Sequence, residues 1–224
     1  MATFVLLPGA GCDAWYWHLV VPDLEAAGHD VLAVDLPVTD DTATFTDYAD
    51  CVVDAIGDRR DVVLVAQSLA GFVAPLVCER VPVELMILVA AMVPRPGESG
   101  GDWWTNTKHD EARDPDASDD PAEIFLHDVP DDVARESEHH VFPQSGSVFD
   151  APWPLDAWPD VPTRFLLCRD DRFFPPAFLR PVVRERLGIE PDEMPGGHTP
   201  ALSHPHELAQ RILRYHEELV DSPQ

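Results

Sequence analysis

The chain has 224 residues, which suffices for one domain with a full hydrophobic core but is too short for two typical enzyme domains. Its 41 acidic and 15 basic residues give a formal net charge of −26, and such a surface repels nucleic acids and anionic membranes, so neither is expected as a partner. No apolar run reaches the length of a membrane span, and the opening residues lack the basic start of a signal peptide, so a cytoplasmic location is expected.

Strands and helices alternate in the first part of the chain. Continuous aliphatic runs predict strands that are buried on both faces, and apolar residues at helical spacing predict the helices between them. In chain order, the sequence predicts a strand at 3–7, a loop at 8–13, a helix ending near Gly28, a strand at 30–36, a helix at about 44–57, a strand at 62–65 followed by a helix, and a strand at 84–90. This alternation predicts a parallel sheet, with ligands bound at the carboxyl ends of its strands.

The alternation stops between about residues 95 and 160, a region rich in Asp, Glu, Pro and Trp. One acidic helix is expected there, around 120–140. The segment is either a long surface insertion or a lid over the strand ends, and its large aromatic residues favour the lid within a single domain spanning 1–224. These residues are Trp103, Trp104, Phe125, Phe142 and Trp153.

Regular elements are expected again after residue 160. The sequence predicts a strand at 163–168, a helix at about 176–187, a short strand near 190–194, and a last helix at about 204–219 that is capped by Ser203.

Neither the cysteines nor the histidines of the 95–160 region have the spacing of a metal site, so no metal ion is expected. The cysteines are scattered without a Cys-x-x-Cys pair, which predicts reduced thiols rather than disulfides. They are Cys12, Cys51, Cys78 and Cys168. The histidines of the region are expected to be solvated, and they are His109, His127, His139 and His140.

Residues 61–72 join an aliphatic strand to an apolar helix through one serine, Ser68. A strand–serine–helix turn is the nucleophile elbow of serine hydrolases, in which a strained turn lifts the hydroxyl clear of the sheet. The usual pattern is Gly-x-Ser-x-Gly, whereas residues 66–70 read Ala-Gln-Ser-Leu-Ala. The alternative is a buried strand and helix with an incidental capping serine.

Three chemically suitable residues follow predicted strands in the order Ser68, Asp171 and His198. This is the chain order of an α/β-hydrolase triad. A serine hydroxyl becomes a useful nucleophile only when a histidine takes its proton, and a carboxylate orients that histidine and stabilises its imidazolium form. The developing oxyanion needs two backbone N–H groups, and we expect them from Leu69 and from Ala10 in the glycine loop.

Four stretches carry further motifs. They read Val-Leu-Leu-Pro-Gly-Ala-Gly with Ala-Trp-Tyr-Trp (5–17), Val-Pro-Asp-Leu-Glu-Ala-Ala-Gly-His with Val-Asp-Leu-Pro (21–37), Arg-Asp-Asp-Arg-Phe-Phe-Pro-Pro (169–176) and Gly-Gly-His-Thr-Pro-Ala-Leu-Ser-His-Pro (196–205). Together they resemble the small α/β-hydrolases of the methylesterase and hydroxynitrile lyase branch. The resemblance covers roughly 1–95 and 160–220. It implies a six-stranded parallel sheet with helices on both faces, and it favours Asp171 over Asp170 as the triad acid.

The leading hypothesis is hydrolysis of a small apolar or aromatic carboxylic ester through an acyl-enzyme on Ser68, without a cofactor. A homodimer is compatible with the sequence. A lyase of the hydroxynitrile type is disfavoured because Thr199 stands where such members carry a lysine. A non-hydrolytic cyclase or isomerase stays open, because Pro8 and Gln67 replace histidines that are common in the branch. Epoxide or haloalkane hydrolysis would need an aspartate in place of Ser68, and an intact triad argues against a binding protein without catalysis.

Overall fold

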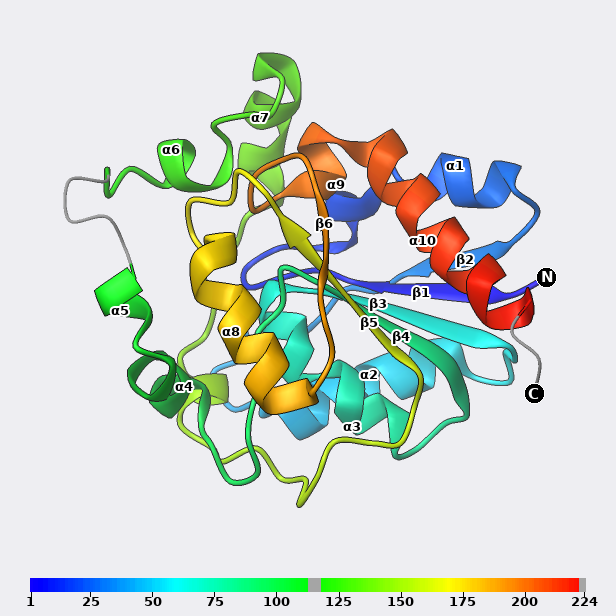
Figure 1. Cartoon of the computed structure of the whole chain (residues 1–224), viewed down its shortest axis with the longest axis horizontal. Helices are drawn as coiled ribbons and strands as arrows, with labels where there is room; N and C mark the ends of the chain where they lie inside the picture. Colours follow the sequence, from blue (N-terminus) through cyan, green and yellow to red (C-terminus); the bar gives the residue numbers. More distant parts are fainter. Residues whose placement is uncertain (113–117, 222–224) are drawn as a thin grey trace.

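The computed structural model describes residues 1–112 and 118–221 and contains one six-stranded parallel sheet (Figure 1). Its strand order is β2-β1-β3-β4-β5-β6, and every adjacent pair is parallel. The strands are β1 (Thr3–Leu7), β2 (Asp30–Ala33), β3 (Val62–Gln67), β4 (Val83–Val89), β5 (Thr163–Cys168) and β6 (Asp192–Met194). The α/β architecture predicted from the sequence is confirmed, and all six strands end at the same edge of the sheet.

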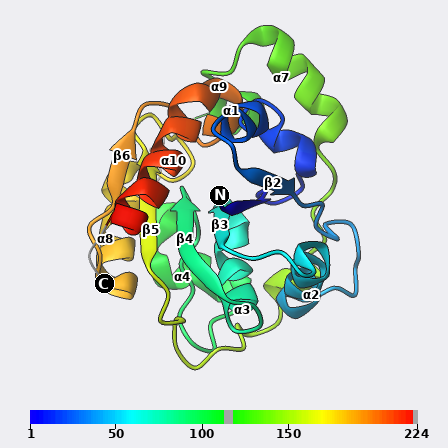
Figure 2. The same cartoon turned by 90° about the vertical axis from the view of Figure 1, so that its right-hand side faces the viewer.

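Helices cover both faces of this sheet (Figures 1 and 2). One face carries α1 (Val21–Ala26), α9 (Pro200–Ser203) and α10 (Pro205–Asp221), and the other carries α2 (Phe45–Ile56), α3 (Ala74–Cys78) and α8 (Pro176–Leu187). Helix α2 begins at a capping box, in which Thr44 and Asp47 satisfy each other's backbone N–H groups.

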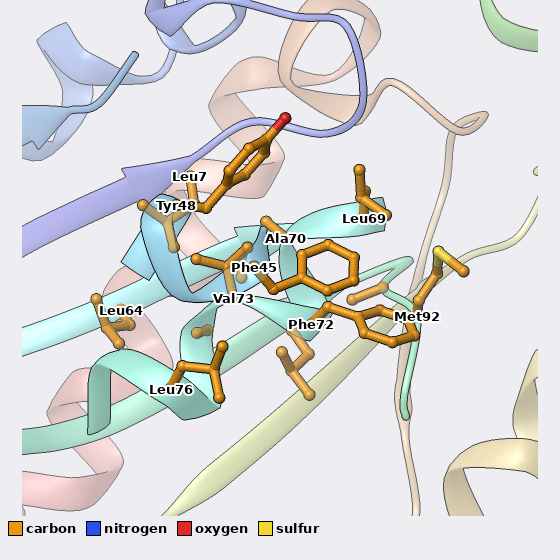
Figure 3. Packing of buried hydrophobic residues seen from close by; sticks show 14 of the residues in the cluster. Leu7, Phe45, Tyr48, Leu64, Leu69, Ala70, Phe72, Val73, Leu76 and Met92 are labelled. Carbon is orange, nitrogen blue, oxygen red and sulfur yellow. The ribbon is translucent and has the colours of Figure 1, made fainter. Parts of the chain in front are cut away.

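The core consists of two apolar layers, one on each side of the sheet. In β3, Val63 and Val65 point into the layer under α1 and α10, whereas Leu64 and Ala66 point into the layer with α2 and α3. Figure 3 shows the second layer, where Phe45 stacks on Phe72 at 4.6 Å between ring centroids. A strand buried on both faces explains why the sequence of β3 shows no polar alternation.

Several elements are shorter than the sequence predicts. The first expected helix consists of a 3-10 turn, η1 (Ala14–Trp17), followed by α1, because Pro22 lacks a backbone N–H and favours the start of a new helix. Helix α10 (Pro205–Asp221) matches the expected last helix, but Ser203 ends the preceding short helix α9 rather than capping α10. Strands β2 and β6 are also shorter than expected, with four and three residues.

The chain between β4 and β5, residues 90–162, is called the inserted segment below. It contains α4 (Gly100–Thr107), α5 (His109–Ala112), α6 (Pro121–Phe125), α7 (Asp131–Ser137) and the 3-10 turns η3 (Glu138–His140) and η4 (Ser147–Phe149). The acidic helix expected around 120–140 is thus two helices separated by a loop that contains Pro130. Across residues 1–112 and 118–221, no helix is both long enough and apolar enough to span a membrane.

Candidate active site

Ser68 lies at the turn between β3 and η2 (Ser68–Phe72), as the nucleophile-elbow interpretation predicts. Its φ of 52° is in the left-handed region, which is unfavourable for a residue with a side chain. The backbone of Met92 packs against this turn, and the Met92 N–H donates to the Ser68 carbonyl at 2.9 Å. The approach is so close that a Cβ on Gly71 would lie 1.9 Å from the Met92 carbonyl oxygen, so only glycine fits at that position.

The structure brings the three predicted triad residues together at the carboxyl edge of the sheet. His198 Nδ1 donates to Asp171 Oδ2 at 2.8 Å, and His198 Nε2 lies 3.0 Å from Ser68 Oγ. With the Nδ1 proton directed at the carboxylate, Nε2 of a neutral imidazole is the acceptor for the serine hydroxyl. All three residues are buried, with exposed fractions of 3% to 8%. The arrangement has the geometry that nucleophile activation requires.

Asp171 and its neighbour Asp170 have different environments. The second oxygen of Asp171, Oδ1, accepts from the backbone N–H groups of Phe173 and Phe174, both at 2.8 Å. Asp170 is exposed, and its carboxylate accepts from the Gly196 N–H instead. Only Asp171 contacts the His198 ring, in agreement with the preference for Asp171 in the sequence analysis.

The two backbone groups expected to hold an oxyanion, the N–H groups of Ala10 and Leu69, belong to residues that line the same cavity as Ser68. Leu69 lies in the first turn of η2, where backbone N–H groups have no partner within the helix. The loop that carries Ala10 passes very close to the elbow, because a Cβ on Gly9 would lie only 2.2 Å from Gln67 Oε1.

Gln67 has a structural role that the sequence analysis did not anticipate. Its Nε2 donates to the backbone carbonyl of His198 at 2.9 Å, and its Oε1 lies against Gly9. One buried amide therefore connects the end of β3 to both the glycine loop and the histidine loop. The only signal in the sequence was the position of Gln67 directly before the predicted nucleophile.

A cavity of about 670 Å³ opens above Ser68 between the strand ends and the inserted segment. Its volume is in the range of small-molecule sites. Aromatic rings form much of the wall, and they belong to Trp15, Tyr16, Trp104, Phe125, Phe149 and Phe173. Two carboxylate residues, Asp120 and Glu138, also line the cavity, whereas no lysine or arginine does among the described residues. Apolar and aromatic side chains therefore make up most of the cavity wall.

The prediction that all histidines of the inserted segment are solvated is wrong for His109. Its side chain is buried, its ring packs against Trp104 and Phe178, and its Nε2 donates to the Phe173 carbonyl at 2.8 Å. Within the parts of the chain that the structure describes, no cluster of three or more His, Cys, Asp or Glu side chains is arranged to hold a metal ion.

The four cysteines are free, as the sequence predicts, and one of them lines the cavity. Burial, reinforced by the charge of Asp13, raises the pKa of the Cys12 thiol to about 11. A thiol with such a pKa is protonated near neutral pH and is a poor nucleophile. Ser68 is therefore the better candidate for covalent chemistry in this cavity.

Residues 4–211 match the alpha/beta hydrolase family, and the chain belongs to this family. Among curated proteins, it is 32% identical to methylesterase 3 of Arabidopsis thaliana over 49% of this chain and 47% of that protein. It is 34% identical to polyneuridine aldehyde esterase of Rauvolfia serpentina over 43% of this chain and 41% of that protein. The chain thus spans less than half the length of these relatives, which place it near the methylesterases of the family.

Solved structures agree on the fold. A crystal structure of polyneuridine aldehyde esterase superimposes with a TM-score of 0.81 at 23% identity, covering 96% of this chain and 99% of that chain. A pyrethroid hydrolase from Sphingobium faniae gives a TM-score of 0.81 at 24% identity and covers 99% of both chains. At these identities the agreement extends to the fold alone.

Proposed function

We propose that the protein is a serine esterase that hydrolyses a small, uncharged carboxylic ester with an apolar or aromatic group. The observation that carries the proposal is the hydrogen-bonded series Ser68–His198–Asp171 at the base of an aromatic cavity. The family and the named activities of the esterase relatives support hydrolysis as the reaction class.

In the proposed reaction, Ser68 Oγ attacks the ester carbonyl carbon while His198 Nε2 takes the hydroxyl proton. The tetrahedral oxyanion accepts hydrogen bonds from the N–H groups of Ala10 and Leu69. When the C–O bond to the alcohol breaks, His198 gives its proton to the leaving alkoxide and an acyl-enzyme remains. Water, deprotonated by His198, then attacks the acyl carbon, and collapse of the second intermediate returns the proton to Ser68 and releases the acid.

Asp171 has an orienting role in this proposal. Its Oδ2 holds the Nδ1 proton of His198, and its Oδ1 is fixed by two backbone N–H groups, so the carboxylate cannot rotate without losing all three bonds. The negative charge stabilises the imidazolium that forms when His198 takes the serine proton. The reaction needs no cofactor.

The inserted segment acts as a lid in this proposal. It supplies Trp104, Phe125 and Phe149 to the cavity wall, so it covers the strand ends and excludes water from the reacting ester. An ester with a bulky apolar group would displace water from these rings on binding, whereas the carboxylates of Asp120 and Glu138 would disfavour an anionic substrate.

The test is hydrolysis of p-nitrophenyl acetate and butyrate by the wild type and by Ser68→Ala, with mass spectrometry after treatment with a fluorophosphonate. We expect a loss of kcat of about 10⁴-fold or more in Ser68→Ala, the scale of nucleophile removal in serine hydrolases. A single adduct on Ser68 is expected in the wild type. Absence of both turnover and adduct would contradict the esterase proposal and favour non-hydrolytic chemistry in the same cavity.

A further inference from the structure

One short stretch of the inserted segment, residues 123–128, contacts both of the loops that carry the proposed acid and base. The stretch comprises the last residues of α6 and the start of the loop that leads to α7 (Figure 1). On the acid side, Arg172 Nη1 donates to the Glu123 carbonyl at 2.9 Å, and His127 Nε2 donates to the Asp170 carbonyl at 3.1 Å. These contacts lie on either side of Asp171.

The same stretch contacts the histidine loop on either side of His198. Thr199 Oγ1 donates to the Phe125 carbonyl at 2.6 Å, and the Gly197 N–H donates to Asp128 Oδ2 at 2.7 Å. The Phe125 ring also lies 5.6 Å from the His198 ring, measured between centroids. Residues 123–128 therefore connect the neighbours of the acid to the neighbours of the base.

The histidine loop has little other support from the sheet. It follows β6, which has three residues and forms the outer edge of the sheet, with pairing to β5 alone. Beyond β6, the Asp170 N–H donates to the Gly196 carbonyl at 3.0 Å, and next to His198 itself the loop is held by side chains, through the bond from Gln67 to the His198 carbonyl and the bond from Gly197 to Asp128. An active-site misplacement of about 1 Å can cost about 10²-fold in rate, so these contacts matter for catalysis.

Asp128 is the residue of this stretch whose side chain makes the contact next to His198. Its Oδ2 accepts the Gly197 N–H, and His204 Nδ1 lies 3.6 Å from the same oxygen. Its Oδ1 is buried and has no hydrogen-bond partner. A buried carboxylate oxygen without a partner is unfavourable, and a nonpolar or neutral residue would avoid this cost if the position served only packing.

We propose that Asp128 is a positioning residue for His198: by holding the Gly197 N–H, it fixes the backbone from which the His198 ring reaches Asp171 and Ser68. In this arrangement, the contacts of residues 123–128 with the two loops align His198 with Asp171. The proposal rests on the esterase function proposed above.

The test compares Asp128→Ala, Asp128→Asn and the control Glu136→Ala, which removes an exposed carboxylate from α7 of the same segment. The Asn side chain retains an oxygen that can accept the Gly197 N–H, so it should rescue positioning, whereas Ala leaves that N–H without its partner. We expect kcat of Asp128→Ala for p-nitrophenyl butyrate to fall about 10²-fold with KM within about threefold, kcat of Asp128→Asn to stay within about fivefold of the wild type, and Glu136→Ala to behave as the wild type.

A second readout needs no turnover. The proton between His198 Nδ1 and Asp171 gives a strongly deshielded ¹H NMR resonance, which we expect to be present in the wild type and in Asp128→Asn but broadened or absent in folded Asp128→Ala. If the wild type hydrolyses no ester, the esterase proposal fails, and this resonance still reports whether Asp128 positions His198. The positioning proposal is overturned if Asp128→Ala keeps the wild-type kcat and resonance, or if its loss of activity follows only the unfolded fraction in a thermal denaturation curve.

Discussion

The three residues of the proposed triad lie on loops that directly follow strands of the sheet, whereas half of the aromatic residues in the cavity wall come from the inserted segment. Ser68 follows β3, Asp171 follows β5 and His198 follows β6. Trp104, Phe125 and Phe149 belong to the inserted segment. Parallel strands bring chemically active residues to one edge regardless of what lies above them. In the proposed function, the sheet therefore positions the reacting residues, while the inserted segment shapes the space for the substrate.

The two regions are also held together differently. The strands are joined by continuous backbone ladders, whereas the inserted segment is attached to the rest of the chain by isolated bonds, such as that from the Phe142 N–H to the Gly11 carbonyl, and by single side chains. The indole N–H of Trp153 donates to the Phe72 carbonyl at 3.0 Å, whereas the indoles of Trp103 and Trp158 donate to carbonyls within the segment, those of Val93 and Pro94, at 3.1 and 2.8 Å. Each tryptophan buries apolar area and satisfies its one polar group at the same time. Such bonds have a specific geometry, but they produce no periodic pattern in the sequence from which they could be predicted.

The largest effect is expected from the acid that follows β5. Asp171→Asn should lower kcat about 10⁴-fold, because an amide no longer holds His198 in the required tautomer, while its oxygen can still accept the backbone N–H groups of Phe173 and Phe174. Steady-state kinetics of ester hydrolysis and a thermal unfolding curve measure both effects. Asp170→Asn is the matched control and should change kcat less than about tenfold. Equal losses in both variants would contradict the assignment of Asp171.

A smaller effect, on stability, should differ between a glycine next to the sheet, Gly71, and a glycine of the inserted segment, Gly146. A Cβ at position 71 would lie 1.9 Å from the Met92 carbonyl oxygen, so Gly71→Ala should destabilise the protein by about 3 kcal/mol or more, equivalent to a Tm lower by about 6–12 °C. Gly146→Ala, in the inserted segment, adds a Cβ with no atom within 4 Å, at a φ of −72°.

Gly146→Ala should therefore change the free energy of unfolding by less than about 0.5 kcal/mol, because its backbone conformation suits alanine. Urea denaturation of the two variants beside the wild type provides the comparison. A Gly71→Ala variant as stable as the wild type would show that the elbow backbone can move away from Met92, and the strain argument for Ser68 would then be lost.

The smallest effect is expected from Cys12, where the two regions meet. Cys12 forms an isolated antiparallel bridge with Val141 of the inserted segment, and burial raises the pKa of its thiol to about 11. A raised pKa keeps the thiol protonated below that pH, so alkylation by iodoacetamide should be slow at pH 8 and accelerate as the pH approaches 11.

Cys12→Ala should retain ester hydrolysis within about twofold of the wild type, since the thiol has no step in the proposed reaction. Labelling rates followed by mass spectrometry, with the kinetics of the variant, give the measurement. Rapid labelling of Cys12 at pH 8, together with loss of activity in Cys12→Ala, would show that the thiol takes part in the reaction and would contradict the proposed mechanism.

The sequence by itself determined the sheet, the family and the residues that the structure brings together as a triad. Four consecutive aliphatic residues at 62–65 are typical of a strand buried on both faces, and the serine that follows marks the turn. Ser68, Asp171 and His198 each come after a strand, and parallel strands end at the same edge of the sheet, so the three residues are expected to lie near one another. These inferences succeed because each depends on local pattern and on a topology that allows few alternatives.

The tertiary structure alone decided which polar groups support the site. Gln67 contacts His198 across 131 positions of sequence, Asp128 contacts Gly197 across 69, and His109 contacts Phe173 across 64. No local pattern distinguishes these residues from exposed ones, because a polar side chain is buried only when a distant partner satisfies it. The first helix and the acidic helix of the inserted segment are divided for the same reason: apolar spacing predicts where helices pack, but prolines and tertiary contacts decide where each one begins and ends.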